Sequence, residues 1–306
     1  MTDNVFLKTI KESAGIRLSV LFGSFFVFLL LSGIISGIIS NVPAGDERDH
    51  SLWSSAVQCI LAFCIPAILL ARFVSTTPLS WLKLEKPLKI KPIIGVIILY
   101  FISLPAMDWL IEWNKGLHLP ESMGALEATL RQWEEASESV SNVLLSAKGF
   151  LPVFSGVIVI GVLTGFSEEL FFRGGLQGIL SKGNMGIAVS IWITALIFST
   201  MHFQFFGFVP RLLMGAFFGY LLFWTGDLKI SAFAHILNNS IVVIMAGIEG
   251  NENLSASELS LIPTLPYLPL VSLVLTVMFF IFCKDFFFRT KSASWQKNQI
   301  PQVTER

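Results

Sequence analysis

Residues 166–175 read Phe-Ser-Glu-Glu-Leu-Phe-Phe-Arg-Gly-Gly, and they constrain how the rest of the chain must fold. They lie inside a long apolar stretch, near residues 150–180, yet they carry two adjacent carboxylates and a guanidinium. Each ionised side chain costs at least about 2.5–3.5 kcal/mol near the centre of a bilayer. We therefore expect Glu168, Glu169 and Arg173 to find polar partners on neighbouring helices. Ionisable groups at membrane depth are by default a functional-site hypothesis.

The composition is that of a membrane protein. Of the 306 residues, 54% are hydrophobic and only 14% are charged, whereas soluble domains carry about 25% charged residues. The formal net charge is zero, which removes any bulk electrostatic case for nucleic-acid binding. The three cysteines form neither a disulfide framework nor a CxxC metal pattern. They are Cys59, Cys64 and Cys283.

Apolar segments of membrane-spanning length recur along the chain, since a helix needs about 20 residues to cross a bilayer. We expect an all-α fold, a polytopic transmembrane helical bundle of about eight spans. The expected spans lie near residues 18–39, 52–70, 93–111, 150–180, 185–206, 212–224, 230–248 and 268–283. The fourth is longer than the bilayer is thick, so it must tilt, project or break near Gly174 and Gly175.

Charged connectors alternate in sign between these spans. Basic residues collect at the N-terminus, in the connector at 72–91 and in the C-terminal tail, whereas the intervening loops are acidic. The positive-inside rule then places both termini in the cytoplasm. The glutamate-rich segment 114–148 is expected outside the membrane as a mostly helical stretch, either a solvated connector or a lid over a site. Arg211 stands at a span boundary and is expected to snorkel towards water.

Further polar residues fall inside the later spans. They are His202 in the fifth span and His235 and Asn239 in the seventh. A lone buried histidine is most often a hydrogen-bonded core residue, but two of them near a glutamate pair favour a shared site. On a helix, residues four apart share a face, so Glu169 and Arg173 can neutralise each other and leave Glu168 for another partner. The polar groups lie within about 10 Å of mid-span, which permits a common cavity.

Such a cavity has the components of a hydrolase. A carboxylate in poorly solvated surroundings is a stronger base than one in water, and a nearby imidazole can share its proton and hold a water molecule. A tetrahedral intermediate also needs hydrogen-bond donors for its oxyanion. His235 and Asn239, one helical turn apart, can both donate to one point.

At these residues the sequence resembles the CAAX prenyl endopeptidase and bacteriocin-processing family of intramembrane proteases. The resemblance covers about residues 150–248. It is carried by three motifs in order, each on its own expected span: Glu168-Glu169-x-x-x-Arg173, Phe198-x-x-x-His202 and His235-x-x-x-Asn239. One motif alone is weak evidence, because such spacings occur by chance in helices.

The resemblance implies a CAAX protease-like intramembrane glutamic endopeptidase. It implies Glu168 as the base on water, assisted by His202, with His235 and Asn239 as the oxyanion site. Glu169 and Arg173 are interpreted as a structural ion pair, and Phe198 as a packing partner of His202. The chemistry implied needs no metal or cofactor.

The resemblance also shapes the expected organisation of the chain. Residues 1–149 would supply N-terminal spans and the extramembrane segment, residues 150–248 the catalytic core, and residues 249–306 the last span and a basic cytoplasmic tail. The expected partners are the lipid bilayer and a peptide or protein substrate, which could be lipid-modified or membrane-embedded, with no nucleic acid. The expected location is a bacterial plasma membrane.

Three alternatives remain open at this point. A zinc protease could use Glu168, His202 and His235 as ligands, although the chain lacks His-Glu-x-x-His. A non-catalytic membrane scaffold or immunity protein could keep the polar core for structure or partner binding. A proton pathway could use the same groups, but the sequence shows no sign of inverted repeats.

Overall fold

The computed structural model describes residues 13–43, 45–146, 148–182, 185–249 and 265–289, and no strand occurs within these ranges. The first half contains α2 (Ala14–Ile39), α3 (Glu47–Gln58), η1 (Cys59–Cys64), α4 (Ile65–Val74), α5 (Pro78–Trp81), α6 (Ile90–Lys115), η2 (Glu121–Met123) and α7 (Gly124–Leu145). The fourth apolar segment contains α8 (Phe150–Gly156), η3 (Val157–Thr164), α9 (Gly165–Glu169), η4 (Leu170–Gln177) and α10 (Gly178–Leu180). The remainder contains α11 (Ile187–Thr200), α12 (Phe208–Thr225), α13 (Leu228–Glu249), α14 (Leu268–Met278), η5 (Phe279–Cys283) and α15 (Lys284–Phe288).

The helical membrane architecture expected from the sequence is confirmed. Seven helices in the described ranges are long and apolar enough to cross a membrane, and an eighth, Ile187–Thr200, is apolar but shorter. The seven are Ala14–Ile39, Glu47–Val74, Ile90–Lys115, Phe150–Leu180, Phe208–Thr225, Leu228–Ile248 and Leu268–Phe288. The chain is therefore an integral membrane protein. The cytoplasmic placement of the termini stays a prediction, and residues 1–12 and 290–306 lie outside the described part.

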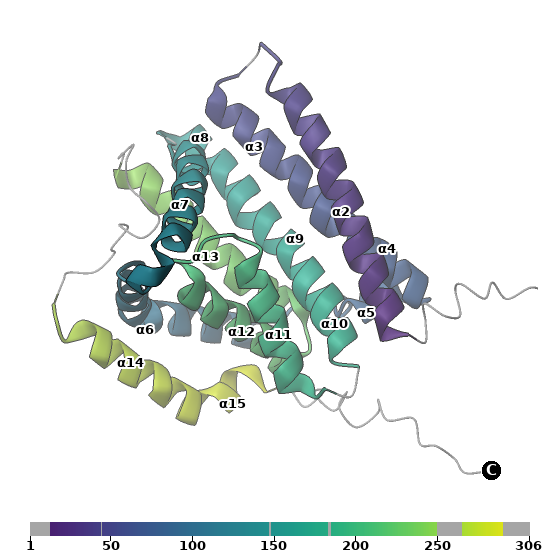
Figure 1. The fold of residues 1–306 in the computed structure, drawn as a ribbon. Coiled ribbons are helices and arrows are strands. Elements are labelled where there is room, and N and C mark those ends of the chain that lie inside the picture. Colours follow the sequence, from purple (N-terminus) through teal and green to yellow (C-terminus); the bar gives the residue numbers. More distant parts are fainter. Residues whose placement is uncertain (1–12, 44, 147, 183–184, 250–264, 290–306) are drawn as a thin grey trace, which may run out of the picture.

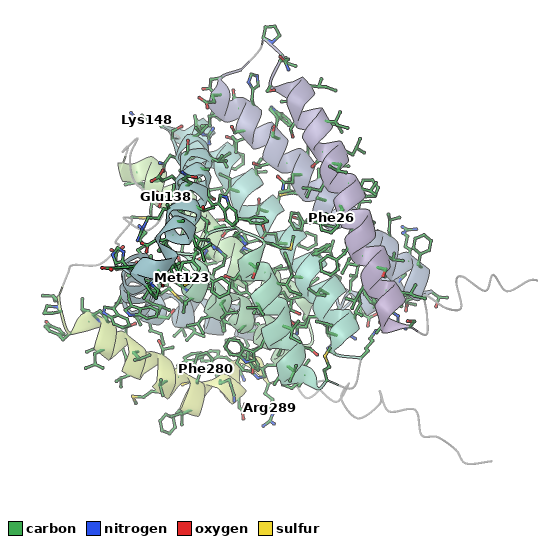
Figure 2. The ribbon with its side chains drawn as sticks, viewed as in Figure 1. Phe26, Met123, Glu138, Lys148, Phe280 and Arg289 are labelled. Carbon is green, nitrogen blue, oxygen red and sulfur yellow. The ribbon has the colours of Figure 1, made fainter. Side chains whose placement is uncertain are left out.

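The helices form an outer shell around a central group. Figure 1 shows α2 with α3 and α4 along one side, α14 and α15 along another, and α9, α11, α12 and α13 between them. Outer helices expose large apolar side chains: Phe26 on α2 is 58% exposed and Phe282 in η5 is 72% exposed. Figure 2 shows Phe26 on the outer side of α2. Such surfaces suit lipid rather than water.

The fourth apolar segment continues without a break through its glycine pair. It runs as one helix from Phe150 to Leu180, 31 residues, with two π-helical stretches, η3 and η4. At about 1.5 Å per residue it is longer than the hydrocarbon layer, so it tilts or projects. Gly174 and Gly175 serve close packing, since a Cβ at Gly174 would lie 3.0 Å from Leu82 Cδ2. The second π-helical stretch starts directly after Glu169, and such stretches are frequent at functional sites.

The fifth segment differs from the expected span at 185–206. Helix α11 ends at Thr200 after 14 residues, so His202 lies in the turn that follows rather than within a helix. A 14-residue helix is about 21 Å long, which is less than the thickness of the hydrocarbon core. A helix of this length that enters at one surface ends inside the membrane. The short helix therefore presents His202 on a loop rather than on a helix face.

Glycine residues on the fourth segment let α13 approach it closely, because they have no side chain. A Cβ at Gly156 would lie 2.9 Å from Val243 Cγ1, one at Gly161 would clash with the Ser240 hydroxyl, and one at Gly165 would lie 3.0 Å from the backbone nitrogen of Ile236. Helix α13 packs on η3 and α9 along this line. Glycines four residues apart are a known signal for close helix contact in membranes, so the Gly161–Gly165 pair could have predicted it.

We expect Gly165→Ala to destabilise the protein by about 1–3 kcal/mol, because the contact is with backbone, which cannot rotate away. The measurement is thermal or denaturant unfolding in detergent. Gly33→Ala on α2 is the matched control, since nothing lies within 4 Å of a Cβ built there. Equal unfolding midpoints for the two variants would contradict the close contact between α9 and α13.

Candidate active site

Glu169 is a fully buried carboxylate that accepts hydrogen bonds from three donors. Arg173 Nη1 lies 2.6 Å from its Oε1, His235 Nδ1 lies 3.0 Å from the same oxygen, and Ser231 Oγ lies 2.5 Å from its Oε2. Its side chain has no exposed area. Three donors around one buried carboxylate favour its ionised form, because each bond stabilises the charge that burial would otherwise disfavour.

Arg173 ties this carboxylate to helix α12. Its Nη2 donates to the carbonyl oxygen of Gly215 at 2.9 Å, and one turn later Gln177 Nε2 donates to the carbonyl oxygen of Gly219 at 3.1 Å. The guanidinium also faces the ring of Phe198, with Cζ 4.6 Å from the ring centroid. Arg173 and Gln177 stand four residues apart on the fourth segment. They donate to the carbonyl oxygens of two glycines that also stand four residues apart, on α12. The glycines allow the helices to come close enough for these bonds.

The imidazole of His235 lies between Glu169 and Glu168. Because Nδ1 faces the Glu169 carboxylate, which only accepts hydrogen bonds, Nδ1 carries a proton, and Nε2 points to Glu168, 3.8 Å from its Oε2. The ring stacks on Phe218, with centroids 4.9 Å apart, and meets the edge of Phe198. Packing and hydrogen bonding together fix both the tautomer and the orientation of the ring.

Glu168 is the unsatisfied member of the pair. Its side chain is 12% exposed, and its Oε2 has no hydrogen-bond partner among the described residues. The distance of 3.8 Å to His235 is too long for a hydrogen bond. A buried carboxylate oxygen without a partner is costly, so this oxygen is available to a water molecule or a ligand in the adjacent cavity.

His202 and Asn239 are held by backbone carbonyls. His202 Nδ1 donates to the carbonyl oxygen of Phe198 at 2.8 Å, which leaves Nε2 for another partner. Its ring also contacts the Phe198 ring, with centroids 4.9 Å apart. Asn239 Nδ2 donates to the carbonyl oxygen of Ile160 at 3.2 Å, and Asn239 Oδ1 accepts from Asn238 Nδ2 at 3.2 Å. The second hydrogen on Asn239 Nδ2 can still be donated.

Two cavities meet at these side chains. The larger, about 850 Å³, is bounded by α2, α3 and η1 and is lined by Glu168, His202 and Asn239. The smaller, about 380 Å³, is bounded by α6, α7 and α12 and is lined by His202, His235 and Asn239. His202 and Asn239 belong to the wall that the two cavities share. The structure therefore brings Glu168, His202, His235 and Asn239 to one junction, whereas Glu169 and Arg173 line neither cavity.

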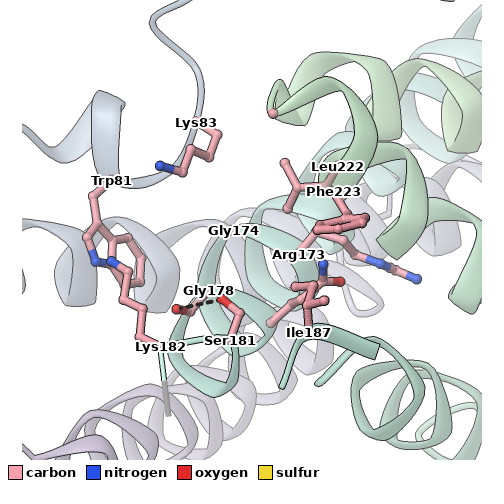
Figure 3. Close-up of a pocket in the computed structure, with 12 residues that line it drawn as sticks. Trp81, Lys83, Arg173, Gly174, Gly178, Ser181, Lys182, Ile187, Leu222 and Phe223 are labelled. Atoms are coloured by element: carbon pink, nitrogen blue, oxygen red, sulfur yellow. Dashed lines mark hydrogen bonds between the residues drawn. The ribbon is translucent and has the colours of Figure 1, made fainter. Parts of the chain in front are cut away.

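A third, much smaller cavity lies away from this junction (Figure 3). Its volume is about 30 Å³, and Trp81, Lys83 and Lys182 are among the residues that line it. Lys182 Nζ lies 5.0 Å from the Trp81 ring centroid, and burial and the neighbouring cations Lys83 and Arg17 lower the pKa of Lys182 to about 8. Arg173 contributes to its wall, but neither glutamate of the pair nor either imidazole does. It is not part of the candidate site.

The extramembrane segment covers the smaller cavity. Its main helix, α7, contributes Glu134 and Glu138 to the lining. It contacts the loop that carries His202 in two places: Glu134 Oε2 accepts from the backbone nitrogen of Phe206 at 3.1 Å, and the Trp133 ring packs edge-on against Phe203. Burial raises the pKa of Glu134. The expected helical segment is present, and its helix α7 forms part of the wall of the smaller cavity.

Two polar residues that support the site had not been singled out in the sequence. Ser231 stands four residues before His235, so its spacing alone could have placed it on the same helix face. Asn114, buried at the end of α6, donates from Nδ2 to the Phe205 carbonyl at 3.3 Å and accepts at Oδ1 from the Val209 nitrogen at 2.7 Å. No sequence signal pointed to this contact, because its partners lie more than 90 residues away.

Arg211, which stands near the start of α12, lies beside the candidate site. It lines the smaller cavity, and its Nη2 donates to Gln204 Oε1 at 2.6 Å. Its other terminal nitrogen, Nη1, is buried and has no hydrogen-bond partner among the described residues. A Cβ at Gly207 would lie 3.0 Å from Nη2, so a larger residue there would oblige the guanidinium to shift.

The zinc alternative requires three metal-ligating side chains arranged around one point. Among the described residues, no group of three or more His, Cys, Asp or Glu side chains is arranged to hold a metal ion. His235 Nδ1 is engaged by Glu169, and His202 Nδ1 by a backbone carbonyl. Each ring keeps Nε2 unengaged by these bonds, but the described part of the chain holds no preformed set of three protein ligands for zinc.

A comparison with protein families bears on the same part of the chain. Residues 150–241 match the family model described as type II CAAX prenyl endopeptidase, Rce1-like. The matched range contains all three motifs and both glutamates of the pair. It confirms the resemblance for this part of the chain. Neither a curated protein nor a solved structure shows a significant match.

Proposed function

We propose that this chain is an intramembrane endopeptidase that hydrolyses a peptide bond with water activated by Glu168. One observation carries the proposal: a buried carboxylate oxygen without a partner faces a cavity and lies 3.8 Å from an imidazole that a second carboxylate holds in place. The family match over residues 150–241 supports the same reaction class.

In the proposed mechanism Glu168 takes a proton from a water molecule held in the shared wall of the two cavities. His202, whose Nε2 is left unengaged by its carbonyl bond, helps to orient that water and shares its proton. The hydroxide attacks the peptide carbonyl carbon, and the proton passes from Glu168 to the leaving amine as the carbon–nitrogen bond breaks. General acid–base catalysis of this kind contributes about 10²–10⁴-fold.

The oxyanion of the intermediate would be bound by His235 and Asn239. Glu169, hydrogen-bonded to His235 Nδ1, holds the ring so that Nε2 faces the site and is the atom that would meet the oxyanion. Asn239 adds its second amide hydrogen. In this proposal Glu169 and Arg173 position His235 and do not touch the substrate. A metal ion has no role.

The substrate and the reaction can be tested together by membrane proteomics. Cells that express the wild-type chain are compared with cells that express Glu168→Gln, which keeps the shape of the side chain and removes the base. New peptide ends should appear only with the wild type. Glu121→Gln, at an exposed carboxylate, is the matched control and should give the wild-type pattern. Identical peptide ends with wild type and Glu168→Gln, together with an unchanged cellular effect, would favour a non-catalytic scaffold or immunity role.

Loss of one oxyanion donor has a characteristic cost. We expect Asn239→Ala to lower the turnover number by about 10²–10³-fold with little change in KM, because the lost bond forms in the transition state. Steady-state kinetics on the substrate found by proteomics measures this. Asn238→Ala is the control, since Asn238 lines the same cavities but bonds only to Asn239 among the described residues. Unchanged turnover in Asn239→Ala would remove this residue from the mechanism.

A further inference from the structure

Arg211 is a cation at the candidate site that the proposed reaction does not use. It stands in the first turn of α12 and lines the smaller cavity together with His202 and His235. One nitrogen, Nη2, donates to the neutral side chain of Gln204. The other, Nη1, is buried and has no hydrogen-bond partner among the described residues. A buried guanidinium with an open donor is costly, and an anion is its natural partner.

Two carboxylates, Glu134 and Glu168, interact electrostatically with Arg211, and neither forms a hydrogen bond with its open donor Nη1. Glu134 lines the same cavity, but its Oε2 accepts from the backbone nitrogen of Phe206 at 3.1 Å. Burial raises its pKa, which favours the neutral acid. In the described part of the chain the two side chains form no ion pair within 4.0 Å. Glu134 therefore leaves the free donor of Arg211 unoccupied.

The surrounding structure holds the guanidinium in a fixed place. Gly207 leaves the space it occupies, and Gln204 orients it. Asn114 bonds to both sides of the intervening loop, at Phe205 and Val209. The donor is therefore preorganised, and less ordering entropy opposes the binding of a ligand.

We infer that Arg211 binds a carboxylate of the peptide substrate. The inference rests on the proposed function, since it assigns the bound carboxylate to the molecule that is cleaved. A planar guanidinium matches a carboxylate better than any other group a peptide carries. The cavity of about 380 Å³ is at the small end of ligand pockets, so the carboxylate belongs to a residue close to the scissile bond. Its source is either the C-terminal carboxylate or an aspartate or glutamate side chain.

The first test is a binding measurement on the full-length protein in nanodiscs, in the Glu168→Gln background. The probes are fluorescent peptides cut from the sequences found by proteomics, or a set of random apolar hexapeptides if none is found. Each is made with a free C-terminus and as the amide, and with Asp or Asn at internal positions. We expect one carboxylate form to bind about 10–100-fold more tightly than its neutral twin, the range for a hydrogen bond to a charged group. If the C-terminal amide binds more weakly than the free acid, the bound group is the C-terminal carboxylate. If the Asn peptide binds more weakly than the Asp peptide, it is a side-chain carboxylate.

Variants of Arg211 assign the preference to this residue. Arg211→Gln in the same background should remove the preference, and Arg211→Lys should retain part of it because the charge remains. Lys115→Gln is the matched control, since it removes another cation that lines the cavity. Thermal unfolding of each variant checks the fold, and Arg211→Lys keeps the test usable if Arg211→Gln unfolds. Equal affinity for the paired peptides, or a preference that survives Arg211→Gln, would overturn the inference.

Cleavage by the protein with Glu168 intact separates this inference from the proposed function. If peptides are cleaved but acid and neutral twins have the same KM, the inference fails and the proposed function stands. If carboxylate-dependent binding is seen but no peptide is cleaved, the endopeptidase proposal fails and Arg211 remains a carboxylate site. If Arg211→Gln raises KM for the acid twin alone, with the turnover number unchanged, both are supported.

Discussion

Glu168→Gln is expected to reduce peptide cleavage by at least about 10²–10⁴-fold, the contribution of a general base. The amide keeps the size of the side chain but cannot take a proton from water. Because Glu168 Oε2 accepts no hydrogen bond from a described residue, the change breaks no hydrogen bond at that oxygen and should leave the unfolding temperature close to that of the wild type. The measurement is the turnover number of the purified protein, with peptide affinity measured alongside. Affinity should be retained, since the loss lies in the chemical step.

The control for this loss is Glu138→Gln. Glu138 is also a carboxylate that lines the smaller cavity, but it stands on α7, outside the membrane-spanning helices. Replacing this carboxylate by an amide should change the turnover number by no more than a few-fold. Full activity in Glu168→Gln would show that this carboxylate is not the base. Equal losses in the two variants would point to the charge of the cavity as a whole.

The second large effect is expected on stability, at the buried ion pair. Glu169→Ala should destabilise the protein by about 3–5 kcal/mol, because it leaves the guanidinium of Arg173 buried without its anion. The double variant Glu169→Met/Arg173→Met should recover much of the loss, since two apolar side chains leave no buried charge. Both should have low activity, because His235 loses the acceptor that orients it. Denaturant unfolding in detergent measures the stability.

The chain provides its own control for this pair. Glu127 and Arg131 on α7 also stand four residues apart, with Oε1 and Nη2 2.7 Å apart, but their side chains are 15% and 38% exposed, whereas those of Glu169 and Arg173 have no exposed area. The hydrogen bond from Arg131, helped by the Leu119 backbone nitrogen and His118, lowers the pKa of Glu127 to about 2. Glu127→Ala should nevertheless shift the unfolding midpoint little, because exposed pairs contribute little to stability. Similar losses for Glu127→Ala and Glu169→Ala would contradict the assigned role of burial.

The sequence predicted well whatever depends on local periodicity. Span lengths follow from runs of apolar residues, and the pairing of Glu169 with Arg173 follows from a spacing of four on one helix. Both are properties of a single helix, so no knowledge of its neighbours is needed. The expectation that the polar residues could share a cavity needed only their depth along each span.

The features that the sequence did not predict depend on contacts between segments that are distant in the chain. Helix α11 ends earlier than its apolar run, and the turn that carries His202 and Arg211 is shaped by Asn114 on another helix. Arg211 has the same local sequence whether it snorkels or turns inward. Its position depends on contacts with Gly207 and Gln204, which lie in the preceding loop. Periodicity carries no information about such contacts.

The shared wall between the two cavities has a consequence for the fate of the products. A peptide cut at that wall would be divided between two chambers, one beside the lipid-facing helices α2 and α3 and the other beneath α7. The two fragments would then depart by separate routes and in either order. Accumulation of one fragment would not block the exit of the other, and the slower departure would set the pace of repeated turnover.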